Sequence, residues 1–411
     1  MDRRNNPYAP GAGLQPPELA GRDRLIDDVT IDMDRVLRRR PTRGLILLGL
    51  RGVGKTVLLN RMRAFADDKG FETAKIEAPE GGALPNLLAP ELRRILYSLD
   101  LRQAGGRHLR RAVNVLRGFA DAFKLKIGDI EFSVDMALGE GDSGNLEQDL
   151  PPLLIAVAEA AAERRSAVGL FLDEIQYLSS VELAAVVVAC HEIAQRNLPL
   201  LFIGAGLPQV AALAGKAKSY AERLFDYPEV GPLDSDAARA AIAIPAQKEG
   251  VSFEDDAVDV ILHATQNYPY FIQEWGFQVW NRASSSPIAP EVVADATPDV
   301  IAHLDTNFFR VRFDRLTVLQ QKYLRAMAEL GPGPHKTGQI ATTLGVAATS
   351  VATVRQQLVN KGMVWSQRHG ETAFTVPLFD NFMKRQMPTL EKHVPARRPR
   401  STRRRTGKLI R

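Results

Sequence analysis

The residues with the clearest chemical potential lie between positions 49 and 56. Gly49, Gly54, Lys55 and Thr56 fit the spacing Gly-x-x-x-x-Gly-Lys-Thr. Glycines let the backbone wrap closely around phosphate, backbone N–H groups bind the anion, a lysine reaches the outer phosphates, and a threonine hydroxyl can bind magnesium. We therefore expect a phosphate site whose contacts come from Gly49, Arg51, Gly52, Val53, Gly54, Lys55, Thr56 and Val57.

The segments on either side of this loop favour the same interpretation. Residues 45–48, Leu-Ile-Leu-Leu, form a short apolar run that is typical of a strand buried on both faces. After the loop, apolar residues recur at helical spacing at Val57, Leu58, Met62 and Phe65. The glycines thus lie where a strand turns into a helix, which disfavours the alternative of a glycine-rich turn with an incidental lysine.

A second stretch with chemical potential follows at residues 167–174, where an apolar run ends in Asp173 and Glu174. We expect Asp173 to hold Mg²⁺ opposite Thr56 and Glu174 to polarise the water that attacks a nucleotide. Two adjacent acids in a solvated turn are the alternative. Gln176 contacts either the same site or the neighbouring strand.

Residues 200–204 predict another buried strand, and no polar side chain follows it at Gly204, Ala205 or Gly206. Arg223 is a third catalytic candidate beside Glu174 and Lys55, because an arginine can offset charge on a transferred phosphoryl group. It would act in its own subunit or in a neighbouring one. The alternative is a surface arginine at a helix end.

The composition is that of a globular chain. At 411 residues it is long enough for two or three domains, and no apolar run approaches the roughly 18 residues of a membrane span. The first residues carry no apolar signal region, and Cys190 is the only cysteine. We therefore expect a cytoplasmic protein without a disulfide or a membrane contact.

The positive charge is concentrated at the C-terminus. Residues 392–411 hold nine of the 53 basic residues and no acid, so the rest of the chain has 44 basic residues against 48 acidic ones. Clustered arginines displace counterions from nucleic-acid phosphates without reading sequence. The tail therefore favours a DNA partner, although a disordered solubilising tail fits the same residues.

Breaks in periodicity and composition predict the domain organisation. The expected parts are an N-terminal arm (1–20), a phosphate-binding domain (21–231) with an insertion at about 97–145, a helical lid (232–290), a connecting helix (291–316), a winged-helix domain (317–390) and a basic tail (391–411). Within the insertion, the alternation over residues 124–135 predicts a small hairpin.

Residues 317–387 have the pattern of a winged helix-turn-helix. Helices are expected around Leu319, Tyr323, Leu324 and Met327, over 337–344 and over 350–360, followed by two strands around a wing tip at 368–370. The third helix fits a major groove. The candidate contacts to double-stranded DNA are Thr349, Thr353, Arg355, Gln356, Lys361 and Arg368. Many winged helices bind protein instead.

Taken in order, these motifs resemble the origin-recognition-like, archaeal-type branch of the AAA+/STAND P-loop ATPases. The resemblance covers about residues 20–387. It implies an α/β fold with a parallel sheet of strand order 5-1-4-3-2, a helical lid, binding of ATP and Mg²⁺, and a place for Gly21 and Arg22 beside the adenine. This chain departs from the family at the end of strand 200–204 and in the lid, which has Asn267 in place of a glycine and no evident arginine.

Three functions are compatible with these motifs. The first is an ATP-dependent switch that binds DNA and hydrolyses ATP slowly. The second is a signalling scaffold of the STAND type, whose winged helix binds protein and whose ATP or ADP state controls formation of a homo-oligomer. The third is a phosphate-loop kinase, which the Asp-Glu pair disfavours.

Overall fold

The computed structural model describes residues 1–390 apart from 12, 103–105, 127–140, 367 and 369. The chain forms two compact units, Met1–Phe308 and a second that begins at Phe309, earlier than the boundary expected at 317. Among the described residues, no helix combines the length and the apolar character that a membrane crossing requires.

A five-stranded parallel sheet organises the first unit. Its strands are β1 (Gly44–Leu48), β2 (Glu72–Glu77), β3 (Val168–Asp173), β4 (Leu200–Gly206) and β5 (Phe225–Asp226). They are ordered β2-β3-β4-β1-β5, which is the predicted order 5-1-4-3-2 counted from the other edge. The α/β fold class and the strand order are therefore confirmed.

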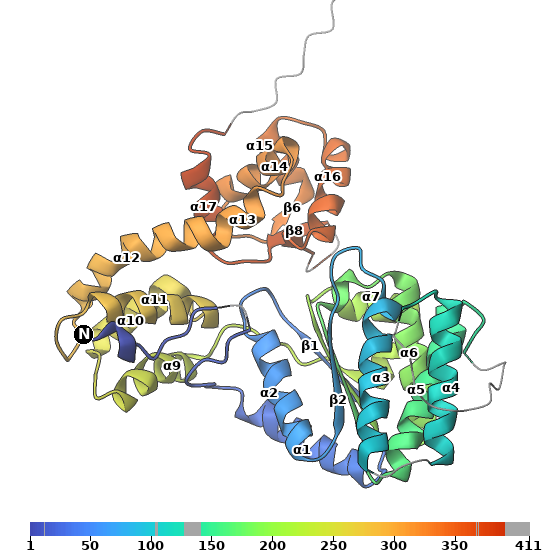
Figure 1. The fold of residues 1–411 in the computed structure, drawn as a ribbon. Coiled ribbons are helices and arrows are strands. Elements are labelled where there is room, and N and C mark those ends of the chain that lie inside the picture. The colour runs from blue at the N-terminus through green and yellow to red at the C-terminus, as the bar shows by residue number, and fades with distance from the viewer. Residues whose placement is uncertain (12, 103–105, 127–140, 367, 369, 391–411) are drawn as a thin grey trace, which may run out of the picture. The chain divides into compact units, whose positions relative to one another are not determined.

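Helices cover both faces of this sheet (Figure 1). One face carries α1 (Asp23–Leu37) and α2 (Lys55–Asp68), and the other carries α5 (Leu146–Glu163) and α6 (Ser180–Gln195). This division follows from right-handed crossovers, since the chain moves one way from β1 to β2 and back again through β3 and β4. All six residues of β3 are buried, as the apolar run predicts.

The insertion between β2 and β3 is mainly helical. It contains α3 (Leu84–Arg102) and α4 (Arg107–Ala122), and α4 buries one apolar face that includes Leu116 and Phe119. Most of the hairpin expected over 124–135 lies outside the described residues. Two short helices, α7 (Val210–Ala217) and α8 (Ala221–Leu224), connect β4 to β5.

The lid consists of α9 (Ser235–Lys248), α10 (Asp255–Thr265) and α11 (Pro269–Arg282), with α12 (Pro290–Leu304) packed against α10 and α11. The N-terminal arm lies on these helices. Tyr8 is 3% exposed, donates a hydrogen bond from its hydroxyl to Ile242 O over 2.6 Å, and packs its ring on Gly276. A side chain at Gly276 would displace that ring, because a Cβ there would lie 2.6 Å from it.

The second unit contains α13 (Arg310–Phe313), α14 (Val318–Glu329), α15 (Thr337–Leu344), α16 (Ala348–Asn360) and α17 (Phe379–Gln386). Strands β6 (His335–Lys336), β7 (Val364–Trp365) and β8 (Glu371–Phe374) form an antiparallel sheet of order β6-β8-β7. Tyr323, Leu324 and Met327 are buried, but Leu319 is 56% exposed, because it lies on the outer face of α14.

Candidate nucleotide site

The loop between β1 and α2 has the geometry that its glycines predict. Gly52 and Gly54 have φ angles of 85° and 93°, in the left-handed region that side chains disfavour. Gly49 is required for lack of space and not for its φ angle, because a Cβ at this position would lie 2.2 Å from Val230 O. The loop therefore brings its backbone N–H groups to the start of α2, the arrangement that binds phosphate.

Lys55 is buried within this loop. Its ammonium donates to Gly49 O at 2.9 Å and to Leu50 O at 2.8 Å, and the residue is only 9% exposed. Burial lowers the pKa of Lys55 to about 8, while the nearby Glu174 and Asp173 carboxylates act in the opposite direction. An anion placed beside this ammonium would stabilise its charged form.

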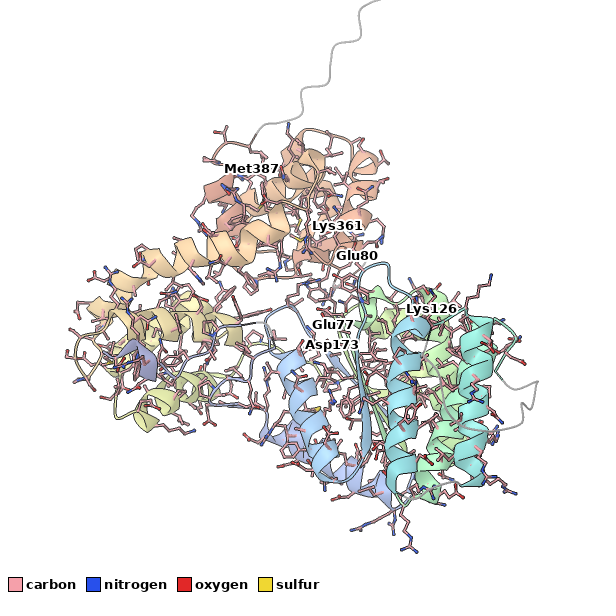
Figure 2. The ribbon with its side chains drawn as sticks, viewed as in Figure 1. Glu77, Glu80, Lys126, Asp173, Lys361 and Met387 are labelled. Carbon is pink, nitrogen blue, oxygen red and sulfur yellow. The ribbon has the colours of Figure 1, made fainter. Side chains whose placement is uncertain are left out.

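Thr56 and Asp173 meet across the site although 117 residues separate them in the chain. The Thr56 hydroxyl donates to Asp173 Oδ2 over 2.7 Å. Asp173 ends β3 beside Glu77, its register partner on β2, and both carboxylates are labelled in Figure 2. Burial raises the pKa of Asp173, and the hydrogen bond from Thr56 opposes that shift.

These two oxygen ligands fit a magnesium ion. Mg²⁺ prefers hydroxyl, carboxylate and phosphate oxygens, and it is commonly held by one or two protein groups together with the nucleotide. Asp173 is 2% exposed, and its carboxylate accepts hydrogen bonds from the Thr56 hydroxyl and the Glu174 backbone N–H, while the nearby Lys55 charge also favours its ionised form. A cation at this position would relieve the desolvation of that carboxylate.

Glu174 follows with a left-handed backbone, φ 54° and ψ 39°. Its N–H donates to Asp173 Oδ1 at 2.8 Å, and its carboxylate accepts a hydrogen bond from Gln176 Nε2. Gln176 Oε1 in turn accepts from Leu207 N at 3.0 Å, just after β4. Gln176 therefore contacts both the site and the neighbouring strand, which the sequence left as alternatives.

The other expected nucleotide contacts have varied surroundings. Arg51 donates to the Tyr177 hydroxyl at 2.6 Å, Val53 packs against Gly49, and Val57 is half-buried on the first turn of α2. Tyr177 is a site residue that sequence reasoning missed, since no motif distinguishes it from an ordinary aromatic residue after β3.

Gly21 and Arg22 lie beside the lid. The Arg22 guanidinium donates to Gly231 O, and burial lowers its pKa. A Cβ at Gly21 would lie 2.6 Å from Ala237 in α9. Their role beside the adenine stays a prediction.

The lid contacts the phosphate loop through its Tyr-Pro-Tyr turn. Tyr270 N donates to Gly52 O at 3.2 Å, and the ring of Tyr268 lies close to Gly52. The two polar lid residues considered from sequence have other partners: Gln273 accepts from Ala9 N, and Glu274 lies 2.7 Å from His303 Nδ1. The lid thus meets the site through backbone and aromatic groups.

Arg223 lies at the opposite end of the sheet. Phe225, two residues later, pairs with Gly44 at the start of β1, whereas the phosphate loop follows the end of β1. Five residues of strand separate these levels, a distance of about 16 Å. The exposed Arg223 therefore does not share the phosphate site of its own chain.

Four of the six candidate DNA contacts are exposed: Thr349, Thr353, Gln356 and Arg368. Arg355 is engaged within its own unit, where it donates to Thr372 Oγ1 and Ser366 Oγ at 2.8 Å each.

Lys361 is engaged in the same unit, since its ammonium donates to Arg315 O at 2.7 Å and to Gln320 Oε1 at 3.1 Å. The wing tip is described only at Arg368 and Gly370, because residue 369 lies outside the described residues. The basic tail lies outside them as well.

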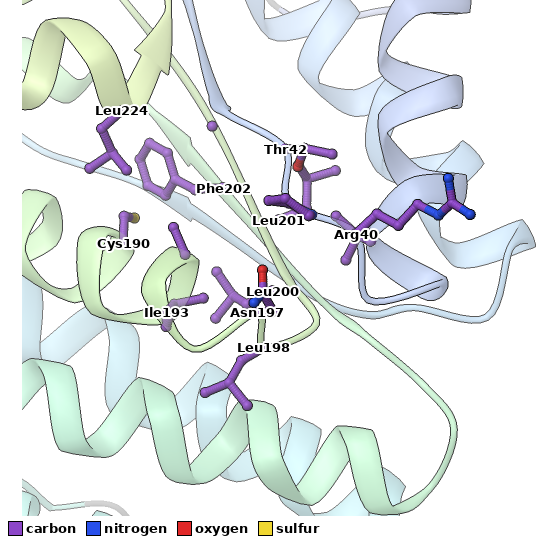
Figure 3. Close-up of a pocket in the computed structure, with 14 residues that line it drawn as sticks. Arg40, Thr42, Cys190, Ile193, Asn197, Leu198, Leu200, Leu201, Phe202 and Leu224 are labelled. Carbon is purple, nitrogen blue, oxygen red and sulfur yellow. The ribbon is translucent and has the colours of Figure 1, made fainter.

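A small pocket elsewhere in the first unit is separate from this site (Figure 3). Its volume is about 40 Å³, and its lining includes Gly44, Leu200 and Cys190. Gly44 and Leu200 begin β1 and β4, so the pocket lies at the amino ends of the strands. The phosphate site lies at their carboxyl ends.

Comparison with known proteins agrees with this geometry. Residues 18–203 match a family model described as an AAA ATPase domain, and residues 306–383 match a domain of unknown function. A comparison with curated proteins found no match. The Walker-type ATPase PABY2304 of Pyrococcus abyssi is similar in structure, with a TM-score of 0.57, 14% identity, and coverage of 90% of this chain and 97% of that one.

Two further structures match with lower TM-scores. The Aeropyrum pernix ORC1 protein in complex with DNA has a TM-score of 0.46 and 15% identity, with 90% of this chain and 94% of that chain covered. The Thermotoga maritima RuvB Holliday junction branch migration motor has a TM-score of 0.44 and 15% identity, with 90% and 98% covered. At these values the shared feature is at most the fold. From the family match and from the site geometry, residues 18–203 form an AAA ATPase domain.

Proposed function

We propose that this chain is a nucleotide-dependent switch that binds ATP with Mg²⁺ and hydrolyses it slowly. The observation that carries the proposal is the meeting of Thr56 and Asp173, 2.7 Å apart, beside the buried Lys55. When bound, Mg²⁺ neutralises charge on the outer phosphates. The loop N–H groups cradle the phosphates, Lys55 faces their outer oxygens, and Glu174 accepts the proton of the attacking water.

Slow hydrolysis is supported by what surrounds the reacting end of the nucleotide. The end of β4 offers Gly204, Ala205 and Gly206, so it brings no side-chain donor to the outer phosphate. Arg223 is at the other end of the sheet. An arginine that offsets transition-state charge contributes about 10³–10⁵-fold to such reactions, so we expect slow hydrolysis by a single chain in which neither the end of β4 nor Arg223 supplies that charge.

Two substitutions test binding and hydrolysis separately. Lys55→Ala should abolish binding of Mg·ATP in calorimetry, because it removes the cation that faces the phosphates. Glu174→Gln should bind Mg·ATP as the wild type does and release phosphate at least about a hundredfold more slowly. Wild-type hydrolysis by Glu174→Gln would show that Glu174 is not the base, and an absence of binding heat in the wild type would refute the proposal.

We further propose that the second unit is a winged helix that binds double-stranded DNA together with the tail. The order α14, β6, α15, α16, β7 and β8 supports this assignment, with α16 as the recognition helix. Thr349, Thr353 and Gln356 are exposed on α16, and Arg368 is exposed between β7 and β8. The nine basic residues of 392–411 would add phosphate contacts.

One observation favours a protein partner instead. Arg355 is the single cation in the sequence of α16, and it is bonded to Thr372 and Ser366 within its own unit. The exposed face of α16 is therefore polar but uncharged, which suits a protein surface as well as a major groove. In this second proposal the ATP site controls oligomerisation of a signalling ATPase.

Salt-titrated DNA binding distinguishes the two proposals. For a DNA-binding chain, log K falls linearly with log salt, with a slope of about −0.9 per phosphate contact, and deletion of 392–411 makes the slope less steep. The matched control keeps the length of the tail but replaces its nine basic residues by glutamine. A slope near zero in the wild type would refute DNA binding and favour the protein partner.

A further inference from the structure

Gln176 connects three parts of the nucleotide site. It lies in the 3-10 turn Ile175–Tyr177, directly after the acidic pair. Its Nε2 donates to Glu174 Oε2, and its Oε1 accepts from Leu207 N at 3.0 Å. A carboxylate only accepts and a backbone N–H only donates, so these two partners fix the orientation of the amide.

The end of β4 is shaped to receive this amide. A Cβ at Gly206 would lie 2.9 Å from Gln176 Oε1, so a side chain there would crowd the hydrogen bond to Leu207. The carbonyl of Gly206 also accepts from Gly49 N at 3.1 Å, at the start of the phosphate loop. A continuous network therefore runs from the Glu174 carboxylate through Gln176 and the end of β4 to Gly49.

The backbone turn at Glu174 brings its side chain to the Gln176 amide. Its left-handed conformation, φ 54°, is uncommon for a residue with a side chain. The turn directs Glu174 and Gln176 to the same side, where the amide donates to the carboxylate. The hydrogen bond from the Gln176 amide restricts the orientations of the Glu174 carboxylate. A fixed orientation toward the water favours transfer of its proton to the carboxylate.

We propose that Gln176 is a positioning residue that holds the Glu174 carboxylate toward the attacking water and links it to the phosphate loop through the end of β4. It compensates for the absence of a polar side chain at Gly204, Ala205 and Gly206. The inference rests on the proposed hydrolysis of ATP, in which Glu174 is the base. Gln176 itself acts through Glu174 and the strand.

The first test separates catalysis from binding. In the full chain, Gln176→Ala should lower kcat for Mg·ATP about tenfold to a hundredfold. It should leave the Kd of Mg·ATP within about twofold of wild type, because the phosphate contacts remain. Gln176→Asn is the matched control: its amide is one methylene shorter and cannot reach both partners, so we expect a loss similar to that of alanine.

A double-mutant cycle identifies the route of the effect. When Glu174→Gln is already present, Gln176→Ala should change the residual rate by less than about twofold, since the group that it positions is gone. Losses that multiply would show that Gln176 acts independently of Glu174 and would overturn the proposal. A Gln176→Ala variant with wild-type kcat would overturn it as well.

An isosteric variant addresses folding and gives a second signature. Gln176→Glu keeps the acceptor for Leu207 N but replaces the amide donor to Glu174 by an oxygen. The kcat of Gln176→Glu should therefore fall about as far as that of Gln176→Ala, while a thermal melt like that of the wild type shows that the fold is retained. A folded Gln176→Glu variant with wild-type kcat refutes the positioning role, whereas a wild type that binds Mg·ATP without releasing phosphate refutes the proposed hydrolysis itself.

Discussion

Raising the pH from 7 to 9 should weaken the binding of Mg·ATP, because Lys55 loses its proton in this range. Burial sets the pKa of Lys55 at about 8 in the free protein. A bound triphosphate beside Gly49 and Leu50, the present partners of the ammonium, favours its charged form and raises that pKa. Binding then takes up a proton, so affinity falls as the pH rises through 8.

The size of the change in the Kd of Mg·ATP follows from the pKa of Lys55. If the pKa in the complex lies well above 9, the Kd of Mg·ATP should rise about tenfold between pH 7 and pH 9. At pH 8, binding should take up about half a proton per site. The single thiol does not contribute, because burial raises the pKa of Cys190 to about 12.

Calorimetry measures both quantities when titrations are repeated in two buffers with different heats of ionisation. Lys55→Arg is the control, since its guanidinium stays charged over this range and should remove the pH dependence even if it weakens binding. A wild-type Kd that is flat from pH 7 to 9, without proton uptake, would refute the reasoning. An equal slope in Lys55→Arg would assign the titration to another group.

Three further predictions follow from the contacts above. Asp173→Asn should remove the gain in ATP affinity that Mg²⁺ gives the wild type, because it removes a carboxylate ligand of the ion. The gain is measured as the ratio of the Kd values for ATP in EDTA and in magnesium, and a gain retained by the variant would contradict the assignment of Asp173 as a ligand. Tyr8→Ala should lower the free energy of unfolding by about 3–5 kcal/mol through loss of its buried ring, against about 1 kcal/mol for Tyr8→Phe, which loses only the bond to Ile242. Arg223 is remote from the phosphate site of its own chain, so it could act only in a neighbouring subunit. In that case the turnover per subunit of the wild type should rise at least about tenfold as the protein concentration is raised, whereas the turnover of Arg223→Ala should stay constant. Turnover that is independent of concentration in both proteins would exclude that role.

Local features of the site were predictable from the sequence. The positions of Gly49, Gly54 and Lys55 between an apolar run and a helical pattern determined a strand, a phosphate loop and a helix, because backbone conformation there follows residue type. The same holds for α15, predicted over 337–344 and ended by Gly345 in the left-handed conformation. The strand order was known in advance only through the family resemblance.

Tertiary structure decided which side chains act on one another. The sequence placed Asp173 and Glu174 at a strand end, but only the packing of β3 against β4 brings Gln176 to Leu207 N. Likewise, only the folded second unit engages Arg355 internally. Such contacts form only when separate helices and strands pack against one another. The spacing of residues within one helix or strand does not show which other element it packs against.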